Sequence, residues 1–366
     1  MESRAHNNST AICTSANGAN HQPKASSPRG LVREVVRPRP NLVALLMMAV
    51  ALLAAANAHA QAFVYWSNSA QYDYGFNPKV AYDGTTVVDV HNGSVGRGPL
   101  WYRVGQLNYP FTSIAFSNSH KYQAEGFNPS VALSGKTVVE VHNATAGPGS
   151  LMYRVGIVNA AKGTIQWGKA YKYDKGFNPS VALSGTTAVE VHNSGAKSGS
   201  EWYRVGSVDP STKTISWSVS SQYDNGFNPS VAIYQFSGTL AVLEVHNGGD
   251  GAGPLWYRDG VVNGSTIAWQ NSSEYVSYGN NPTIGFDGEA FVEVHNGDAG
   301  GIVELWDDSG EWFENSLLWQ ESQNYDIGMN PSVSLTSSGA YAVEVHNGAV
   351  GVGPLWYRIG QIEIIQ

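Results

Sequence analysis

The chain has 366 residues, of which 21 are basic and 29 acidic, and a formal net charge of −8. About the first 60 residues differ in character and hold six of the basic and two of the acidic residues, so the remainder carries a net charge of −12. That balance argues against nucleic acid and anionic lipid surfaces as partners, because both select clustered lysine and arginine. The single cysteine, Cys13, lies in this first part, and about 300 residues bury enough surface to fold without disulfides.

Residues 1–60 have the features of a leader and signal peptide. Arginines precede an unbroken apolar run at residues 42–56, and Ala58-His59-Ala60 fits the small-x-small cleavage pattern. An uncleaved transmembrane helix is the alternative, but it needs roughly 20 apolar residues. We therefore expect cleavage near Ala60 and a secreted product, extracellular or periplasmic, with no membrane span after cleavage.

The remaining chain repeats one unit six times. A Glu-x-His-Asn pattern, with aspartate first in the initial copy, recurs at a spacing of about 50 residues, which indicates a repeat architecture. The expected domain spans 61–366. Its units cover 67–116, 117–167, 168–217, 218–269, 270–319 and 320–366, the last completed by residues 62–66.

The third unit shows the elements that each repeat predicts. In chain order they are a turn-rich connection (173–179), a strand (180–183), a tight turn (184–185), a strand (186–192), a Gly/Ser-rich loop (193–200), a strand (202–208), a turn (209–213) and a strand (214–217). Four short strands per unit without helical periodicity predict an all-β fold, a six-bladed β-propeller. The strand at 62–66 resembles the fourth strand of other units and would close the ring.

The connection lengths predict which face carries function. The connection into each Asn-Pro strand is the longest in its unit, so we expect it to cross between blades, with the Asn-Pro strand innermost. These crossings and the loops after the His-Asn pairs then share one face, and the opposite face has short turns. Binding residues are expected on the loop-rich face.

The polar residues that recur in each unit can be interpreted in two ways, as a structural pair within the blade or as ligand-binding residues. On a strand, Glu140 and His142 point to one face of the sheet, while Val139, Val141 and Asn143 point to the other. A Glu–Arg or Glu–His pair within each blade would be a structural tether, since buried charges need partners. The fifth unit tests this, because Asp307-Asp308 there replaces the Tyr-Arg pair of the other units.

The chemistry of the loop-rich face favours sugar. Aromatic rings stack against the apolar face of a sugar, and polar groups bind its hydroxyls. Packing between blades is the alternative role for the same aromatic residues. No histidines have ligand spacing such as His-x-x-x-His, so we predict no metal and no cofactor. Near-equivalent units suit multivalent binding better than catalysis, which needs one asymmetric site.

At these residues the chain resembles the secreted microbial β-propeller lectins, in which each blade interface carries a shallow sugar site. The resemblance covers residues 63–366 and implies sites between blades on the loop-rich face. The predicted carbohydrate-binding residues are His91, Asn92, Trp101, His142, Asn143, His192, Asn193, Trp202, His246, Asn247, Trp256, His295, Asn296, Trp306, His346, Asn347, Trp356, Tyr72, Tyr173, Tyr223 and Tyr325.

The function expected from the sequence is therefore secreted, multivalent carbohydrate binding without catalysis. Two alternatives stay open. One is a glycan-acting hydrolase or lyase with an asymmetric site near the fifth blade, where only Asp307, Asp308 and Glu304 offer extra carboxylates. The other is a protein-binding or adhesion scaffold.

Overall fold

The computed structural model describes residues 61–298, 302–313, 316–336 and 340–365. The predicted leader and signal peptide lie outside these residues. Within them, no helix has the length and apolarity needed to cross a membrane. The described residues belong to one compact unit, Ala58–Gln366.

The unit is built almost entirely from antiparallel strands, which fall into six groups of four that we call blades one to six. The strands are β1 (Gln61–Trp66), β2 (Ala70–Asp83), β3 (Thr86–Asn92), β4 (Gly98–Asn108), β5 (Ser113–Phe116), β6 (His120–Ser134), β7 (Thr137–Asn143), β8 (Gly149–Asn159), β9 (Thr164–Trp167), β10 (Tyr171–Ser184), β11 (Thr187–Asn193), β12 (Gly199–Asp209), β13 (Thr214–Trp217), β14 (Ser221–Phe236), β15 (Thr239–Asn247), β16 (Gly253–Asn263), β17 (Thr266–Trp269), β18 (Ser273–Phe286), β19 (Ala290–Asn296), β20 (Val303–Phe313), β21 (Ser316–Trp319), β22 (Gln323–Leu335), β23 (Tyr341–Asn347) and β24 (Gly353–Ile365). One short 3-10 helix, η1 (Ala160–Lys162), interrupts them.

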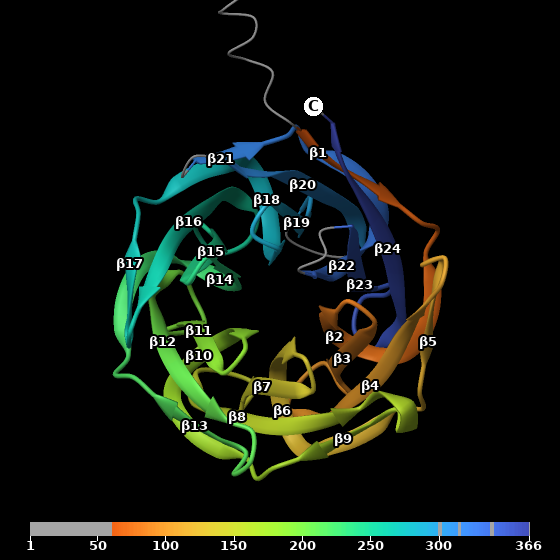
Figure 1. Ribbon diagram of the computed structural model, residues 1–366, viewed down its shortest axis with the longest axis vertical. Helices are drawn as coiled ribbons and strands as arrows, with labels where there is room; N and C mark the ends of the chain where they lie inside the picture. Colours follow the sequence, from red (N-terminus) through yellow and green to blue (C-terminus); the bar gives the residue numbers. More distant parts are fainter. Residues whose placement is uncertain (1–60, 299–301, 314–315, 337–339, 366) are drawn as a thin grey trace, which may run out of the picture. The chain divides into compact units, whose positions relative to one another are not determined.

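The blades are arranged as a ring, with β6, β10 and their equivalents toward the centre and β9, β13 and their equivalents at the rim (Figure 1). Blade one is β2–β5, and each later blade takes the next four strands. Blade six is β22–β24 together with β1, which pairs with β24 along its length from Gln61↔Ile365 to Trp66↔Gly360. The all-β propeller prediction and the closure by an N-terminal strand are confirmed.

The crossings between blades differ from the prediction, because they are strands and not loops. The first half of β10 pairs with β8 of blade two, as in Tyr171↔Tyr153, and its second half pairs with β11 of blade three. A register shift between Phe177 and Ser180 separates the halves, and Asn178 there has a φ of 48°. Asparagine tolerates this left-handed conformation better than most residues. The long strand therefore bends at Asn-Pro and ties two blades together.

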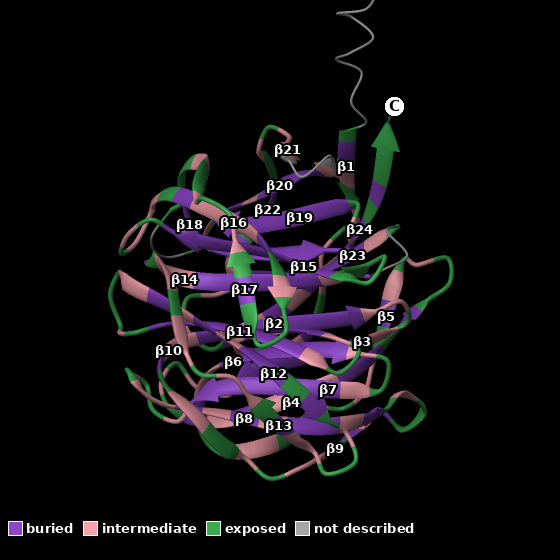
Figure 2. Ribbon diagram, turned by 60° about the vertical axis from the view of Figure 1, so that its left-hand side comes forward, coloured by how far each residue is buried: buried purple, intermediate pink, exposed green. Residues whose placement is uncertain are grey.

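The core lies between neighbouring blades. Val139 and Val141 of blade two, for example, pack with Val181 and Ile215 of blade three. Buried strands alternate with exposed turns around the ring (Figure 2). The β-branched residues of the middle strands supply this packing because their side chains fit a pleated surface.

Aromatic pairs reinforce each junction at its outer side. The ring of Tyr173 stacks on Trp217 with centroids 5.2 Å apart, and Tyr153 meets the same indole edge-on at 6.0 Å. The crossing tyrosine therefore has its ring committed to packing between blades, which was the alternative role that the sequence left open.

Candidate functional site

Each histidine of the repeat lies inside its blade beside a carboxylate. His192 Nδ1 lies 3.1 Å from both carboxylate oxygens of Glu190, and the Tyr173 hydroxyl donates to Glu190 at 2.8 Å. Glu190 is completely buried and His192 is 2% exposed. Burial and the nearby Glu190 carboxylate raise the pKa of Tyr173 well above its usual value, so the hydroxyl stays protonated as a donor.

Where a repeat has the arginine, its side-chain partner lies on the crossing strand and is not the carboxylate that it faces within the blade. Arg204 faces Glu190 across the strands, yet its Nε lies 2.5 Å from Asp174 on the crossing strand. Of the two pairs that the sequence left open, Glu–Arg or Glu–His, blade three has the Glu–His pair. In blade two Gln123 takes the aspartate position and accepts a hydrogen bond from Arg154 at 2.6 Å.

The asparagine of the Glu-x-His-Asn pattern clamps one blade to the next. Asn143 Oδ1 accepts from the backbone N–H of Asn178 at 3.1 Å, and its Nδ2 donates to the Gly176 carbonyl at 3.1 Å. Both ends of the amide are thus used by the protein. Asn193 makes the equivalent contact with the N–H of Asn228 at 2.9 Å.

Burial separates the predicted sugar ligands into two groups. The histidines and asparagines of the pattern are at most 3% exposed, and Tyr72 and Tyr325 are also buried. Their burial gives no support to direct contact with a ligand. Tyr173, Tyr223 and the tryptophans are half-buried: Trp101, Trp202, Trp256, Trp306 and Trp356. The sugar-binding role of all these residues stays a prediction.

Blade five departs from the others through a pair of changes at one junction. Asp308 stands at the arginine position, and Val276 stands where four other crossings have aspartate. Asp308 lies 3.5 Å from His295 Nδ1. Burial raises the pKa of Asp307 and of Asp308 to about 7 each, and neighbouring carboxylates add to the rise. Both side chains are buried, so they do not form an open carboxylate pair on the surface.

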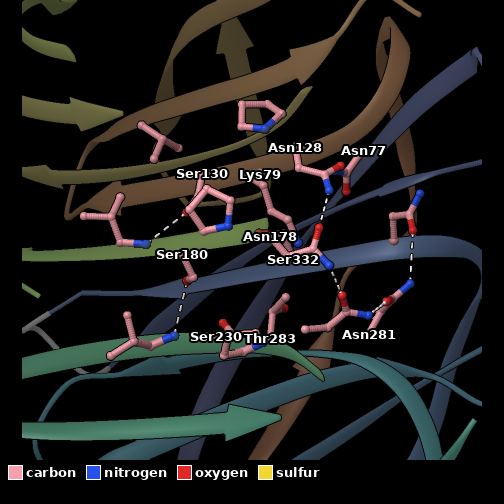
Figure 3. Close-up of a pocket in the computed structure, with 18 of the residues that line it drawn as sticks. Asn77, Lys79, Asn128, Ser130, Asn178, Ser180, Ser230, Asn281, Thr283 and Ser332 are labelled. Atoms are coloured by element: carbon pink, nitrogen blue, oxygen red, sulfur yellow. Dashed lines mark hydrogen bonds between the residues drawn. The ribbon is translucent and has the colours of Figure 1, made fainter. Parts of the chain in front are cut away.

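A cavity lies at the centre of the ring. It has a volume of about 250 Å³, slightly below the range of about 300–1,000 Å³ that is typical of small-molecule pockets. Six asparagines of the Asn-Pro pairs line it, and Figure 3 shows their amides linked from blade to blade. The chain of hydrogen bonds runs through Asn77, Asn128, Asn178, Asn228, Asn281 and Asn330.

The asparagine amides retain hydrogen-bond donors and acceptors that the chain of amides does not use. An amide offers two N–H donors and an oxygen with two lone pairs, and the chain of hydrogen bonds uses one donor and one lone pair of each interior member. Half-buried phenylalanines precede four of the asparagines; Phe127 stacks with Phe177 at 6.4 Å, and Phe177 with Phe227 at 6.5 Å. Of these phenylalanines, Phe76 and Phe127 line the cavity together with the amides.

Lys79 makes the cavity asymmetric, and the sequence reasoning missed it. Four other blades have serine at this position and blade five has Thr283. Ser332 and Ser180 accept hydrogen bonds there from backbone N–H groups of the next blade. Burial lowers the pKa of Lys79 to about 8. Aligning the six units at their Asn-Pro pairs would have revealed this substitution.

The architecture defines the class of protein as a β-propeller, and comparison of structures agrees. Sialidase from Trypanosoma rangeli aligns with a TM-score of 0.51 at 11% identity, over 79% of this chain and 55% of the sialidase. A mutant of that sialidase with trans-sialidase activity aligns with a TM-score of 0.49 at 11% identity, over 79% and 54%. A protein from Bacteroides fragilis proposed to be a 6-phosphogluconolactonase aligns at 0.45 and 10% identity, over 79% and 88%.

At these identities the likeness shows the fold alone, and the chain spans about half the length of the sialidases. No family model and no curated protein matches the sequence.

Proposed function

We propose that the chain is a secreted carbohydrate-binding protein that takes its ligand on the loop-rich face. The observation that carries this proposal is the chain of asparagine amides around the central cavity. Each interior amide retains a donor and an acceptor, the same pair of functions that a sugar hydroxyl presents. Phe127 lies in the cavity lining and supplies an aromatic surface for the apolar face of a sugar.

Lys79 indicates that the sugar carries a negative charge. It is the one cationic side chain among the residues that line the cavity, and no aspartate or glutamate lines it. An acidic sugar would pair its carboxylate with the Lys79 ammonium in a partly desolvated setting, where charge-assisted hydrogen bonds are strong. The absence of carboxylates from this lining favours binding over hydrolysis, because most glycosidases use two of them.

A more specific version of this proposal is that several sugars bind to each chain, at the junctions between blades. The half-buried Trp202 and its equivalents lie beside the loops at the blade junctions, and exposed Tyr74 and Tyr278 lie on the crossings. The number of sugars bound per chain distinguishes six shallow sites from one axial site. Several weak sites on one chain would increase the affinity for a multivalent ligand.

The test is a glycan array with the purified protein, followed by calorimetry on any hit. An axial site predicts one sugar per chain, with binding lost in Phe127→Ala and weakened in Lys79→Ser for acidic sugars. Inter-blade sites predict several sugars per chain and weakening by Trp202→Ala. Tyr109→Ala, an exposed aromatic on the opposite face, is the control and should bind normally. An array without hits overturns carbohydrate binding in favour of a protein-binding scaffold.

A hydrolase centred on blade five is the alternative that the sequence left open. Burial raises the pKa of Asp307 and of Asp308 to about 7, which suits a general acid, but the same burial keeps both carboxyls away from a substrate on the surface. Turnover of aryl glycosides that Asp308→Asn abolishes would establish it. Equal activity in the variant and the original chain would remove it.

A further inference from the structure

Glu201 occupies a position that is leucine in every other blade. Its equivalents are Leu100, Leu151, Leu255, Leu305 and Leu355, all fully buried, and Glu201 is itself 0% exposed. A carboxylate in an apolar site costs several kcal/mol unless a proton, a partner or a metal ion neutralises it. Glu201 is therefore the one charged residue at a position that is otherwise leucine in the repeat, and its charge needs an explanation.

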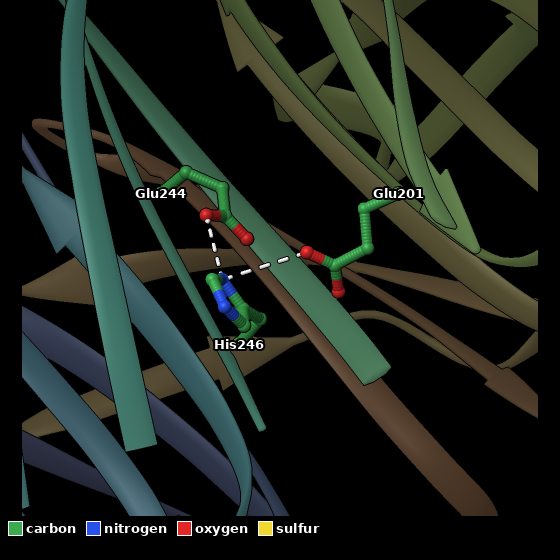
Figure 4. Close-up of side chains that lie close together, drawn as sticks. All are labelled: Glu201, Glu244 and His246. Atoms are coloured by element: carbon green, nitrogen blue, oxygen red, sulfur yellow. Dashed lines mark hydrogen bonds and ion pairs between the residues drawn. The ribbon is translucent and has the colours of Figure 1, made fainter. Parts of the chain in front are cut away.

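Three potential ligands converge there from two neighbouring blades. Glu201 comes from β12 of blade three, and Glu244 and His246 come from β15 of blade four (Figure 4). His246 Nδ1 lies 3.0 Å from Glu244 Oε2 and 3.5 Å from Glu201 Oε2. One ligand atom from each of the three residues lies within 4.8 Å of the others.

The oxygens that face this point lack hydrogen-bond partners. Glu201 Oε2 and Glu244 Oε1 are buried without one. In four blades the crossing tyrosine donates to the corresponding carboxylate, as Tyr173 does to Glu190. The hydroxyls of Tyr223 in blade four and Tyr275 in blade five are buried without such a bond. In blade four, Glu244 Oε1 is therefore left without a donor.

Among the described residues, His246 is the only basic side chain that pairs with the two carboxylates. Arg258, the nearest arginine of the repeat, lies 3.4 Å from Asp224 and also donates to the backbone carbonyls of Tyr223 and Gln270. Asn193 Nδ2 approaches Glu201 Oε1 at 3.5 Å, which orients the carboxylate but adds no charge. A divalent cation would neutralise Glu201 and Glu244 together.

We propose that Glu201, Glu244 and His246 form a buried site for a divalent cation of the Zn²⁺ or Mn²⁺ class. Two carboxylates and one imidazole are ligands that these ions accept in proteins. The ligands come from two blades, so the spacing of histidines within one segment does not reveal this site and led to the expectation of no metal. Since the ligands are buried, we expect the ion to bind during folding and to stabilise the junction between blades three and four.

The test compares the metal content of the purified full chain with that of Glu201→Leu, after expression with added Zn²⁺ or Mn²⁺ and dialysis against metal-free buffer. We expect elemental analysis to show one metal equivalent fewer per chain in Glu201→Leu. Melting of the original chain should fall after treatment with a chelator, while melting of Glu201→Leu should not change. Leucine is the residue of the other blades, so this variant should fold.

Glu201→Gln provides a second variant of similar shape, and we expect it to lose the same metal equivalent. Asp209→Asn removes an exposed carboxylate and is the control, which should bind metal as the original chain does. The proposal is overturned if the original chain and Glu201→Leu hold equal metal and respond equally to the chelator. A metal-free original chain that Glu201→Leu stabilises would also overturn it, because Glu201 would then be a buried protonated acid.

Discussion

Arg103 and Asp73 form an ion pair across the junction of the first and last blades, with Arg103 Nε 2.7 Å from Asp73 Oδ2. Asp73 belongs to the part of β2 that pairs with β24 of blade six, and Arg103 belongs to β4 of blade one. The ring is thus closed by side-chain charge as well as by the pairing of β1. Where blade five lacks the arginine, it also lacks the aspartate, so no half-buried carboxylate is left at Val276.

The equivalent pair in blade three should tolerate an amide but not a truncation. We expect Asp174→Gln to cost under about 1 kcal/mol, because Gln123 already accepts from Arg154 in blade two. Asp174→Ala should cost about 2 kcal/mol, because the half-buried Arg204 loses a charged acceptor. Urea unfolding measures both values. Equal costs for the two variants would show that the acceptor is unimportant.

The hydroxyl of the crossing tyrosine should contribute to stability only where it is hydrogen-bonded. Tyr173→Phe is expected to lower the free energy of unfolding by about 1–3 kcal/mol, because buried Glu190 loses a donor. Tyr223→Phe is the matched control in metal-free buffer, since the Tyr223 hydroxyl has no partner there to lose. Chemical denaturation compares them, and a similar loss in both would contradict the assignment.

Stability should fall as the pH rises from about 4 to 7, and Asp308 should be one cause. Burial raises the folded-state pKa of Asp308 from 3.8 to about 7, so its contribution is present below the unfolded pKa and lost as pH rises through the folded one. We expect Asp308→Asn to flatten this part of the profile of melting temperature against pH. An unchanged slope in the variant would mean that Asp308 ionises normally in the folded chain.

Binding of an acidic sugar at the central cavity should weaken above about pH 8. The pKa of Lys79, which burial lowers to about 8, sets the pH at which its positive charge is lost. Neutral sugars should show no such dependence, and Lys79→Ser should remove it for acidic ones. Calorimetric titrations at pH 6.5 and about 9 are the measurement. A pH profile that survives Lys79→Ser would assign the effect to another group.

The repeat made much of the architecture predictable from sequence. The regular spacing of the histidines indicated a repeated structural unit. The alternation of polar and apolar residues at Glu140, Val141 and His142 indicated a β-strand with one polar and one apolar face. The match between residues 62–66 and other fourth strands indicated how the ring closes. The spacing could not show that the segment around Asp174 is a strand that pairs with β8 of the preceding blade, because this pairing joins two repeat units.

The candidate site was less accessible to sequence reasoning, for the same physical reason. Period and residue type determined the all-β propeller, because local strand preferences and a regular repeat are properties of the chain alone. Only the tertiary structure decided that Glu190 pairs with His192 and Tyr173 while Arg204 pairs with Asp174, that the six asparagines meet at the centre, and that Glu201 faces His246. Apart from the Glu190–His192 contact within β11, these contacts join residues of different strands or blades, so they exist only after the ring has formed.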